Sequence, residues 1–241
     1  MTANLRFLLM QIRNPDDPMR EQEVGCFARA MRCEPSQIST WDILSSVPSD
    51  HELAEYDMTM LGGSGDYSAT STEAWIEPIL DLFRRLHQQS KPTFASCWGF
   101  QAMARAMGGT VVHDLDRAEV GTRQLKLTDA GREDKIFSSL GKTFHAQMGH
   151  ADRVDQLPTD AVLLASTDRV ENQAYCFADK PIYCTQFHPE LNRENLLGRL
   201  TQYPEYVDKI AGVSIEEFRD TLQDTPETEE LLRRFVAEFF G

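Results

Sequence analysis

The sequence lacks the cysteine spacings that would indicate a metal site or a disulfide framework. It has five cysteines, and no two of them form a Cys-x-x-Cys pair. An odd number without such spacing favours neither zinc binding nor a small secreted scaffold. We therefore expect a reduced, cytoplasmic protein that needs no metal and no cofactor. The five are Cys26, Cys33, Cys97, Cys176 and Cys184.

Basic side chains are scarce relative to acidic ones. The chain has 24 Lys and Arg against 38 Asp and Glu, which gives a net charge of −14. A surface of this sign repels phosphate backbones and anionic lipid, so we expect no nucleic-acid partner and no membrane partner. The simplest role of this charge is solubility.

Long apolar runs are absent as well. The run Phe7–Met10 is flanked by Arg6 and Arg13 and is too short for the core of a signal peptide. No stretch approaches the ~20 apolar residues that cross a membrane. The glycine-rich stretch 62–65 is not followed by lysine, and its spacing does not match the phosphate loop Gly-x-x-x-x-Gly-Lys-Ser/Thr.

The sequence does contain an alternation of short apolar runs and segments with helical periodicity. This order predicts an α/β fold with an open, mostly parallel sheet of the flavodoxin-like or Rossmann-like kind, covered by helices. After Gly109 the chain becomes richer in strand patterns, which either extend the sheet or fold back over its edge. The expected strands are 5–12, 41–47, 57–61 and 91–96, and the expected helices are 18–32, 72–89 and 98–107.

Two further helices are expected at the end of the chain. Ser214 and Glu217 have the spacing of a capping box, and Thr225-Pro226 fits the N-cap and first turn of a last helix. We expect residues 201–241 to form a helical extension packed on a domain of residues 1–200, with a partner-binding surface as the alternative. The side chains expected to dock on the core are Leu232, Phe235, Val236 and Phe239.

The stretch Phe-Ala-Ser-Cys-Trp-Gly-Phe-Gln at 94–101 places Cys97 between an expected strand and an expected helix. On such a turn a nucleophile stands clear of the sheet, and the helix N-terminus stabilises negative charge on it. The turn needs small residues two positions before and after the nucleophile, where Ala95 and Gly99 stand. The backbone N–H of Trp98 would then point toward a developing oxyanion. By itself the stretch fits a buried, inert cysteine slightly better than a reactive one.

Further residues favour the reactive interpretation. A thiol nucleophile needs a general base, and the base needs an orienting carboxylate. His188 directly follows the apolar run 181–187, and Glu190 lies two residues further on. Because the carboxyl ends of parallel strands share one rim, Cys97 and His188 are predicted to meet there. The glycines of Gly62-Gly63-Ser64-Gly65, at another strand end, let backbone amides approach a substrate, or else form a plain turn.

Taken together, these residues resemble the class I (triad) glutamine amidotransferase family. The shared motifs are the glycine-rich turn 62–65, the Cys-x-Gly-x-Gln elbow 97–101 and Phe-His-Pro-Glu at 187–190. A fourth segment, Met-Gly-His-Ala-Asp-Arg-Val-Asp-Gln-Leu-Pro at 148–158, is similar to a segment in the glutaminase domain of GMP synthetases. The resemblance covers residues 5–200 and implies the class I glutamine amidotransferase-like fold.

The resemblance also implies roles for individual residues. Cys97 would be the nucleophile that forms a γ-glutamyl thioester, His188 the base and Glu190 the residue that orients it. The N–H groups of Gly63 and Trp98 would form the oxyanion hole. The glutamyl group would be bound by Gln101, Gly62, Gly149 and His150, the last of these mainly through its backbone.

The function implied is that of a stand-alone hydrolase that cleaves the γ-carboxamide of glutamine to glutamate and ammonia. Two alternatives remain: a γ-glutamyl peptidase with the same triad, and a non-catalytic binding protein on this fold. The Ser-Gly-Gly-x-Asp-Ser loop of the synthetase domain in GMP synthetase does not occur here, so an ammonia-accepting synthetase would be a separate subunit. The remaining histidines, interpreted as surface or structural residues, are His51, His87, His113 and His145.

Overall fold

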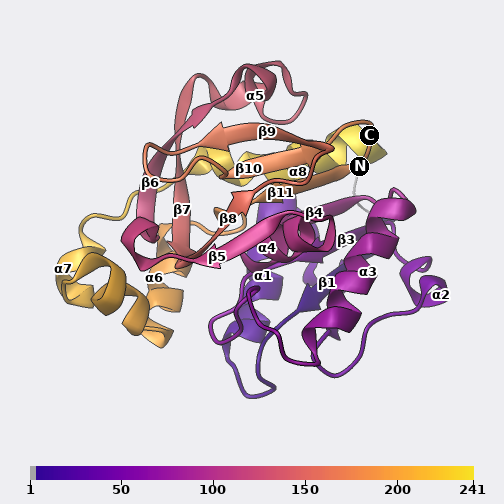
Figure 1. The fold of residues 1–241 in the computed structure, drawn as a ribbon, viewed down its shortest axis with the longest axis horizontal. Coiled ribbons are helices and arrows are strands. Elements are labelled where there is room, and N and C mark those ends of the chain that lie inside the picture. Colours follow the sequence, from indigo (N-terminus) through magenta and orange to yellow (C-terminus); the bar gives the residue numbers. More distant parts are fainter. Residues whose placement is uncertain (1–3) are drawn as a thin grey trace.

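The computed structural model describes residues 4–241 and is built on a nine-stranded mixed sheet (Figure 1). Its parallel half confirms the α/β fold expected from the sequence. In spatial order this half consists of β2 (Ile38–Asp42), β1 (Phe7–Gln11), β3 (Met58–Leu61), β4 (Thr93–Ser96) and β11 (Ile182–Thr185). The sheet continues, with antiparallel pairing, through β10 (Ala174–Phe177), β9 (Ala161–Ser166), β6 (Glu119–Leu127) and β7 (Thr143–His150).

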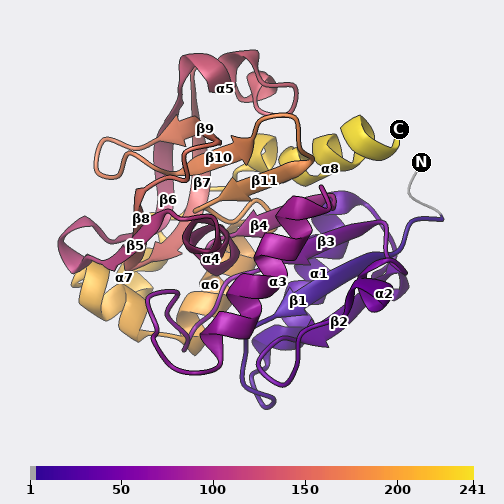
Figure 2. The ribbon, with the colours of Figure 1, turned by 45° about the vertical axis from the view of Figure 1, so that its right-hand side comes forward.

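Helices cover both faces of the parallel half (Figure 2). On one face α1 (Met19–Met31) and α8 (Pro226–Phe240) pack on side chains such as Phe7 and Leu9. On the other face α3 (Ile76–Gln88) and α4 (Trp98–Ala106) pack on the alternating residues Leu8 and Met10. Burial on both faces explains why these strands are continuous apolar runs.

Smaller elements complete the fold. β5 (Thr110–His113) and β8 (Asp152–Gln156) form a separate two-stranded ribbon beside α4. Short helices are α2 (Asp50–Leu53) and α5 (Asp129–Glu133), and single 3₁₀ turns lie at Pro35–Gln37, Leu115–Arg117 and Ser138–Leu140. The C-terminal part contains α6 (Arg193–Gln202), a π-helical turn at Val207–Ala211 and α7 (Ile215–Arg219).

Some expected boundaries differ from the observed ones. The second strand occupies residues 38–42 instead of 41–47, because β2 is an edge strand whose pairing with β1 begins opposite Phe7 and whose side chains are partly exposed. The capping box of Ser214 and Glu217 is present. Thr225 makes no capping hydrogen bond, and its hydroxyl oxygen instead lies 3.4 Å from the Gln147 amide nitrogen, which donates to it.

The last helix docks through most of the residues expected. Leu232, Phe235 and Val236 are buried in the core, whereas Phe239 stays 36% exposed although its ring contacts that of Phe235. Residue 200, where the boundary between the domain and its extension is expected, lies within α6.

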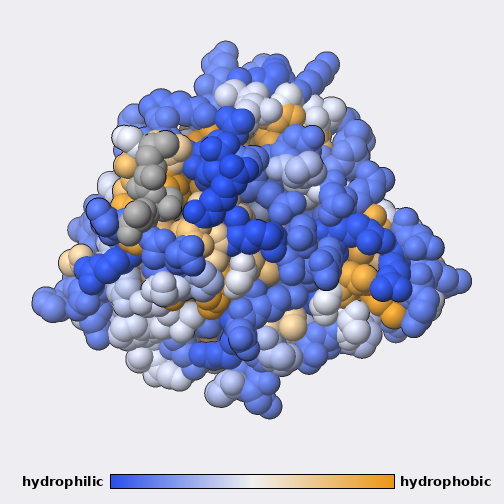
Figure 3. All heavy atoms as spheres, turned by 180° about the vertical axis from the view of Figure 1, so that it is seen from behind, coloured by the Kyte–Doolittle hydropathy of each residue, from blue (hydrophilic) through white to orange (hydrophobic). Residues whose placement is uncertain are grey.

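No helix in the described part of the chain is long and apolar enough to span a bilayer. The face seen in Figure 3 is mainly hydrophilic, with apolar residues in separate small areas.

Candidate active site

Cys97 lies on a strained turn between β4 and α4. Its backbone has φ 52° and ψ −103°, which is a rare conformation for a residue with a side chain. The Cys97 N–H donates to the Thr185 carbonyl on β11 at 2.7 Å, and its carbonyl accepts from the Gln101 N–H at 3.1 Å. These bonds hold the turn between the strand and the helix. A Cβ at position 99 would lie 2.6 Å from the Cβ of Leu61, so only glycine fits there.

His188 and Glu190 form a buried pair next to this turn. The Nδ1 of His188 lies 2.7 Å from Oε1 of Glu190, and the two residues are 5% and 0% exposed. An ionised carboxylate only accepts hydrogen bonds, so Nδ1 carries the proton and Nε2 is left to face the thiol.

The charges in this pair shift both pKa values. Burial alone would lower the pKa of His188, but the negative charge of Glu190 and the Cys97 sulfur outweigh it and raise the pKa to about 9. Burial alone would raise the pKa of Glu190, but His188 and Arg199 lower it to about 2. The pair is therefore an ion pair across the neutral pH range.

The glycine turn lies against both side chains. A Cβ on Gly63 would be 2.8 Å from Cε1 of His188 and 3.5 Å from the Cβ of Cys97. The carbonyl of Gly62 accepts a hydrogen bond from the Gly99 N–H at 3.2 Å, which ties the turn to the start of α4. The ends of β3, β4 and β11 thus bring Gly63, Cys97 and His188 to one rim of the sheet.

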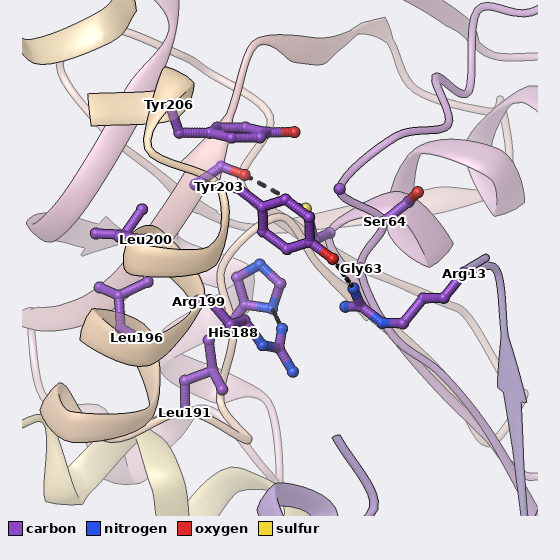
Figure 4. Close-up of a pocket in the computed structure, with 13 residues that line it drawn as sticks. Arg13, Gly63, Ser64, His188, Leu191, Leu196, Arg199, Leu200, Tyr203 and Tyr206 are labelled. Carbon is purple, nitrogen blue, oxygen red and sulfur yellow. Dashed lines mark hydrogen bonds between the residues drawn. The ribbon is translucent and has the colours of Figure 1, made fainter. Parts of the chain in front are cut away.

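Two cavities meet at Cys97. The first, of about 40 Å³, contains His188 and is walled by Leu191, Leu196 and Leu200 (Figure 4). The second, of about 150 Å³, shares Cys97, Gly149 and Tyr206 with the first and has a more polar wall. The lining of the second cavity includes Ser68, Trp98, Gln101, His113, Gly149, His150 and Asp152.

The residues expected to bind a glutamyl group lie near this second cavity, although not all of them face it. The Gly149 carbonyl is 3.8 Å from the Cys97 sulfur. The Gln101 amide nitrogen donates to the Asp152 carbonyl and to the Gln186 side chain, so this group is already engaged. Gly62 does not line either cavity, because its Cα faces Glu23, whose carboxylate occupies the space that a Cβ would need.

Both ring nitrogens of the buried His150 lie close to other residues of the protein. Its Nδ1 lies 3.0 Å from the Asp152 carbonyl, and its Nε2 is 3.4 Å from the carboxylate of Glu119. His150 therefore contacts the cavity wall while its imidazole is held within the protein.

Sequence reasoning missed several residues at this site. His113 was expected to lie outside it, yet it lines the second cavity, and its Nδ1 is 2.7 Å from Oδ1 of Asp152. Tyr203 and Tyr206, from the C-terminal part, line the cavity of His188 (Figure 4). No motif pointed to these residues, since none of them belongs to the family pattern of residues 5–200 on which the expected site was built.

The other cysteines lie away from the cavities. Burial raises the pKa of Cys26, Cys33, Cys176 and Cys184, which disfavours their thiolates. Among residues 4–241, no three His, Cys, Asp or Glu side chains converge in a way that could hold a metal ion.

Comparison with known proteins identifies the family. Residues 28–196 match the model of glutamine amidotransferase class-I, and the chain belongs to this family. The match contains the elbow, the glycine turn and the His188–Glu190 pair, so the resemblance expected from the motifs is confirmed.

Two kinds of relative are similar in sequence. A glutamine-hydrolysing GMP synthase of Flavobacterium psychrophilum is 31% identical over 74% of this chain and 35% of its own length. Gamma-glutamyl peptidase 4 of Arabidopsis thaliana is 26% identical over 98% of this chain and 93% of its own length. The chain thus spans about a third of the synthase and nearly all of the peptidase.

Solved structures show the same fold. A glutamine amidotransferase from Thermotoga maritima superposes with a TM-score of 0.74 at 20% identity, covering 98% of both chains. A putative GMP synthase subunit from Thermoplasma acidophilum has a TM-score of 0.62 at 21% identity, covering 84% of this chain and 98% of its own.

Proposed function

We propose that this protein hydrolyses the γ-carboxamide of glutamine to glutamate and ammonia, with Cys97, His188 and Glu190 as the catalytic triad. One observation carries the proposal. A cysteine on a strained strand-to-helix turn lies beside a buried histidine whose far nitrogen is bonded to a carboxylate. This is the arrangement that a thiol nucleophile requires.

The reaction would proceed in two acyl-transfer steps. The Cys97 thiolate attacks the γ-carbonyl carbon, and the N–H groups of Gly63 and Trp98 stabilise the oxyanion. The C–N bond then breaks, and the leaving nitrogen takes its proton from the His188 imidazolium to depart as ammonia. Water next attacks the thioester, gives a proton to His188, and releases glutamate as the C–S bond breaks.

The sizes of the two cavities favour an amide over a peptide. The acyl group would occupy the larger, polar cavity beside Gln101. The leaving group must depart on the side of His188, which protonates it. The cavity there, of about 40 Å³, is smaller than the polar cavity of about 150 Å³. It accommodates ammonia more readily than the amino acid or peptide that a γ-glutamyl peptide would release.

A γ-glutamyl peptidase is the second candidate. The observation in its favour is the similarity to gamma-glutamyl peptidase 4, which extends over 98% of this chain. In this case the wall of Tyr203 and Tyr206 would have to move to admit the departing peptide.

Ammonia released here would reach an acceptor in a separate synthetase subunit, if one is used. The proposal is supported by the GMP synthases, in which the similar region forms about a third of the chain. A pull-down with the purified protein as bait tests for such a subunit.

Mass spectrometry separates the two activities. The protein is given glutamine in one reaction and γ-glutamyl dipeptides or glutathione in another, with Cys97→Ala as the control. We expect glutamate from glutamine and a Cys97 peptide carrying one γ-glutamyl group. Preferential turnover of the peptides would instead support the second candidate, and the absence of any Cys97-dependent turnover, with or without a synthetase, would contradict both.

A further inference from the structure

A buried arginine lies behind the His188–Glu190 pair. Arg199 extends from α6 and is only 6% exposed. Its Nη1 is 3.4 Å from Oε1 of Glu190. The same atom is 3.4 Å from Nδ1 of His188 (Figure 4). Because the Nδ1 proton is already donated to Glu190, the carboxylate accepts from Arg199, and the contact with the imidazole is electrostatic.

The rest of the Arg199 guanidinium is fixed by α1. Its Nε donates to Oε1 of Gln22 at 3.0 Å, and its Nη2 lies 3.8 Å from Oε1 of Glu23. The carboxylate of Glu23 is fully buried and also pairs with Arg13 at 3.2 Å. Arg199 is thus held between two buried carboxylates, one of which belongs to the proposed triad.

This cluster also reaches the glycine turn and the C-terminal part. Glu23 fills the space that a side chain at position 62 would need. Arg13 donates to the hydroxyl of Tyr203 at 3.2 Å, and that hydroxyl donates to Asp17 at 2.6 Å. Alternating charges therefore connect Glu190 with the turn and with the cavity wall.

We propose that Arg199 is a positioning residue for the reaction, which fixes the Glu190 carboxylate against His188 and limits how strongly that carboxylate holds the imidazolium. The role rests on the proposed function of the triad. It acts through Glu190 and His188, the two triad residues that its Nη1 contacts.

The electrostatics give the direction of the effect. The charged or titratable groups near His188 and Glu190 are Cys97 at the N-terminus of α4, Arg199 on α6, and Cys26, Glu23 and Arg29 on α1. Arg29 donates to the backbone carbonyl of Glu190 at 2.7 Å, whereas Arg199 is the cation that contacts the Glu190 carboxylate. Without the Arg199 charge, the Glu190 carboxylate attracts only the His188 imidazolium. The repulsion between the imidazolium and the guanidinium is also lost. The His188 proton then becomes harder to give to a leaving group.

Two substitutions separate charge from geometry. In Arg199→Gln we expect the alkaline limb of the kcat/KM profile to move up by about one pH unit, with kcat at neutral pH reduced roughly tenfold. Arg199→Lys keeps the positive charge but loses the planar guanidinium and its fixed N–H donors. We therefore expect the alkaline limb of the kcat/KM profile to stay in place, while kcat falls and KM changes little. Arg153→Gln is the matched control, because Arg153 is also 6% exposed and also pairs with two carboxylates, Asp114 and Asp155.

A second readout does not require turnover. The rate at which iodoacetamide alkylates Cys97 is followed against pH by peptide mass spectrometry in the same variants. In the wild type the upper inflection reports loss of the His188 proton, and we expect it to rise in Arg199→Gln and not in Arg153→Gln. If the wild type releases no glutamate, the proposed function fails, and this profile still decides the role of Arg199.

The outcomes are decisive in each case. A folded Arg199→Gln with the wild-type limb and the wild-type alkylation profile would overturn the proposal. If Arg199→Gln does not fold, Arg199→Lys decides: wild-type kcat refutes a positioning role, and reduced kcat with an unchanged limb supports it. If the wild type is inactive, the rate of Cys97 alkylation in Arg199→Lys is compared with that of the wild type in place of kcat.

Discussion

The two cavities that meet at the Cys97 sulfur differ in size and in lining. The cavity beside Gln101 is larger and polar, and its wall includes the His113–Asp152 pair. The cavity beside His188 is smaller, and its wall combines three leucines with Arg13, Arg199 and two tyrosines. The larger cavity thus offers hydrogen bonds that can hold a polar acyl group, and the smaller one offers less space. This difference is consistent with the proposal that the leaving group is small.

The largest effect is expected from removing the Cys97 sulfur, at the point where the two cavities meet. In Cys97→Ala, glutamate release from glutamine should fall at least about 10³-fold, because no acyl-enzyme can form. Cys176→Ala, at a buried cysteine on β10 that lines neither cavity, should keep full activity. Appreciable turnover by Cys97→Ala in a coupled glutamate assay would show that another group is the nucleophile.

The next effect concerns the His188 side alone. In Glu190→Gln, kcat/KM should fall by about 10²–10³-fold, since the imidazole loses its orienting carboxylate. The wild-type rate should decline as the pH rises through about 9, where the His188 imidazolium loses its proton. Without the negative charge of Glu190 this limb should move to lower pH, opposite to the shift expected for Arg199→Gln. The pH profile of kcat/KM measures it.

The control for this substitution is Glu238→Gln, which removes a carboxylate that pairs with Lys135 on the surface. Its profile should match the wild type. An unchanged alkaline limb in Glu190→Gln would mean that Glu190 does not set the pKa of His188.

A smaller effect is expected where the two cavities touch the glycine turn. In Gly63→Ala the new Cβ would lie 2.8 Å from the His188 ring. The ring must shift, and we expect kcat to fall by about 10²-fold while thermal unfolding changes little. Gly25→Ala is the matched control, because a Cβ there meets nothing within 4 Å. Wild-type kcat in Gly63→Ala would indicate that the turn adapts freely.

The smallest effect tests the wall that the two cavities share at Tyr206. In Tyr206→Ala this wall recedes, and the ratio of kcat/KM for γ-glutamyl dipeptides over glutamine should rise roughly tenfold. Phe239→Ala removes an aromatic ring of α8 that lines neither cavity and should leave the ratio unchanged. A ratio that does not rise would show that this wall does not select the leaving group.

Much of the site could be predicted because its main parts are local. The elbow at Cys97 needs small residues at fixed positions, and the run before His188 indicates a strand end, so sequence patterns point to both. The edge strand β2 was misplaced because its partly exposed residues lack an apolar run. The residues that α6 and the segment after it add to the site, Arg199, Tyr203 and Tyr206, were missed. A buried arginine such as Arg199 has no distinctive spacing in the sequence.

The contact with β7 also depends on the whole fold. β7 is the last strand in the sheet order, yet its Gln147 carbonyl accepts from the His188 N–H at 2.9 Å. The sheet must curl for Gly149 to approach Cys97, and that curvature comes from many cross-strand contacts at once.

The sequence by itself determined the α/β order, the strand-to-helix turn at Cys97 and the motifs that place the chain in its family. These depend on short-range periodicity and on steric limits at single residues. Only the tertiary structure decided which charges surround Glu190, which residues wall the two cavities and how much space each cavity offers. Those properties arise from packing between segments that are far apart in the chain. Burial and distance there set the strength of each interaction between charges.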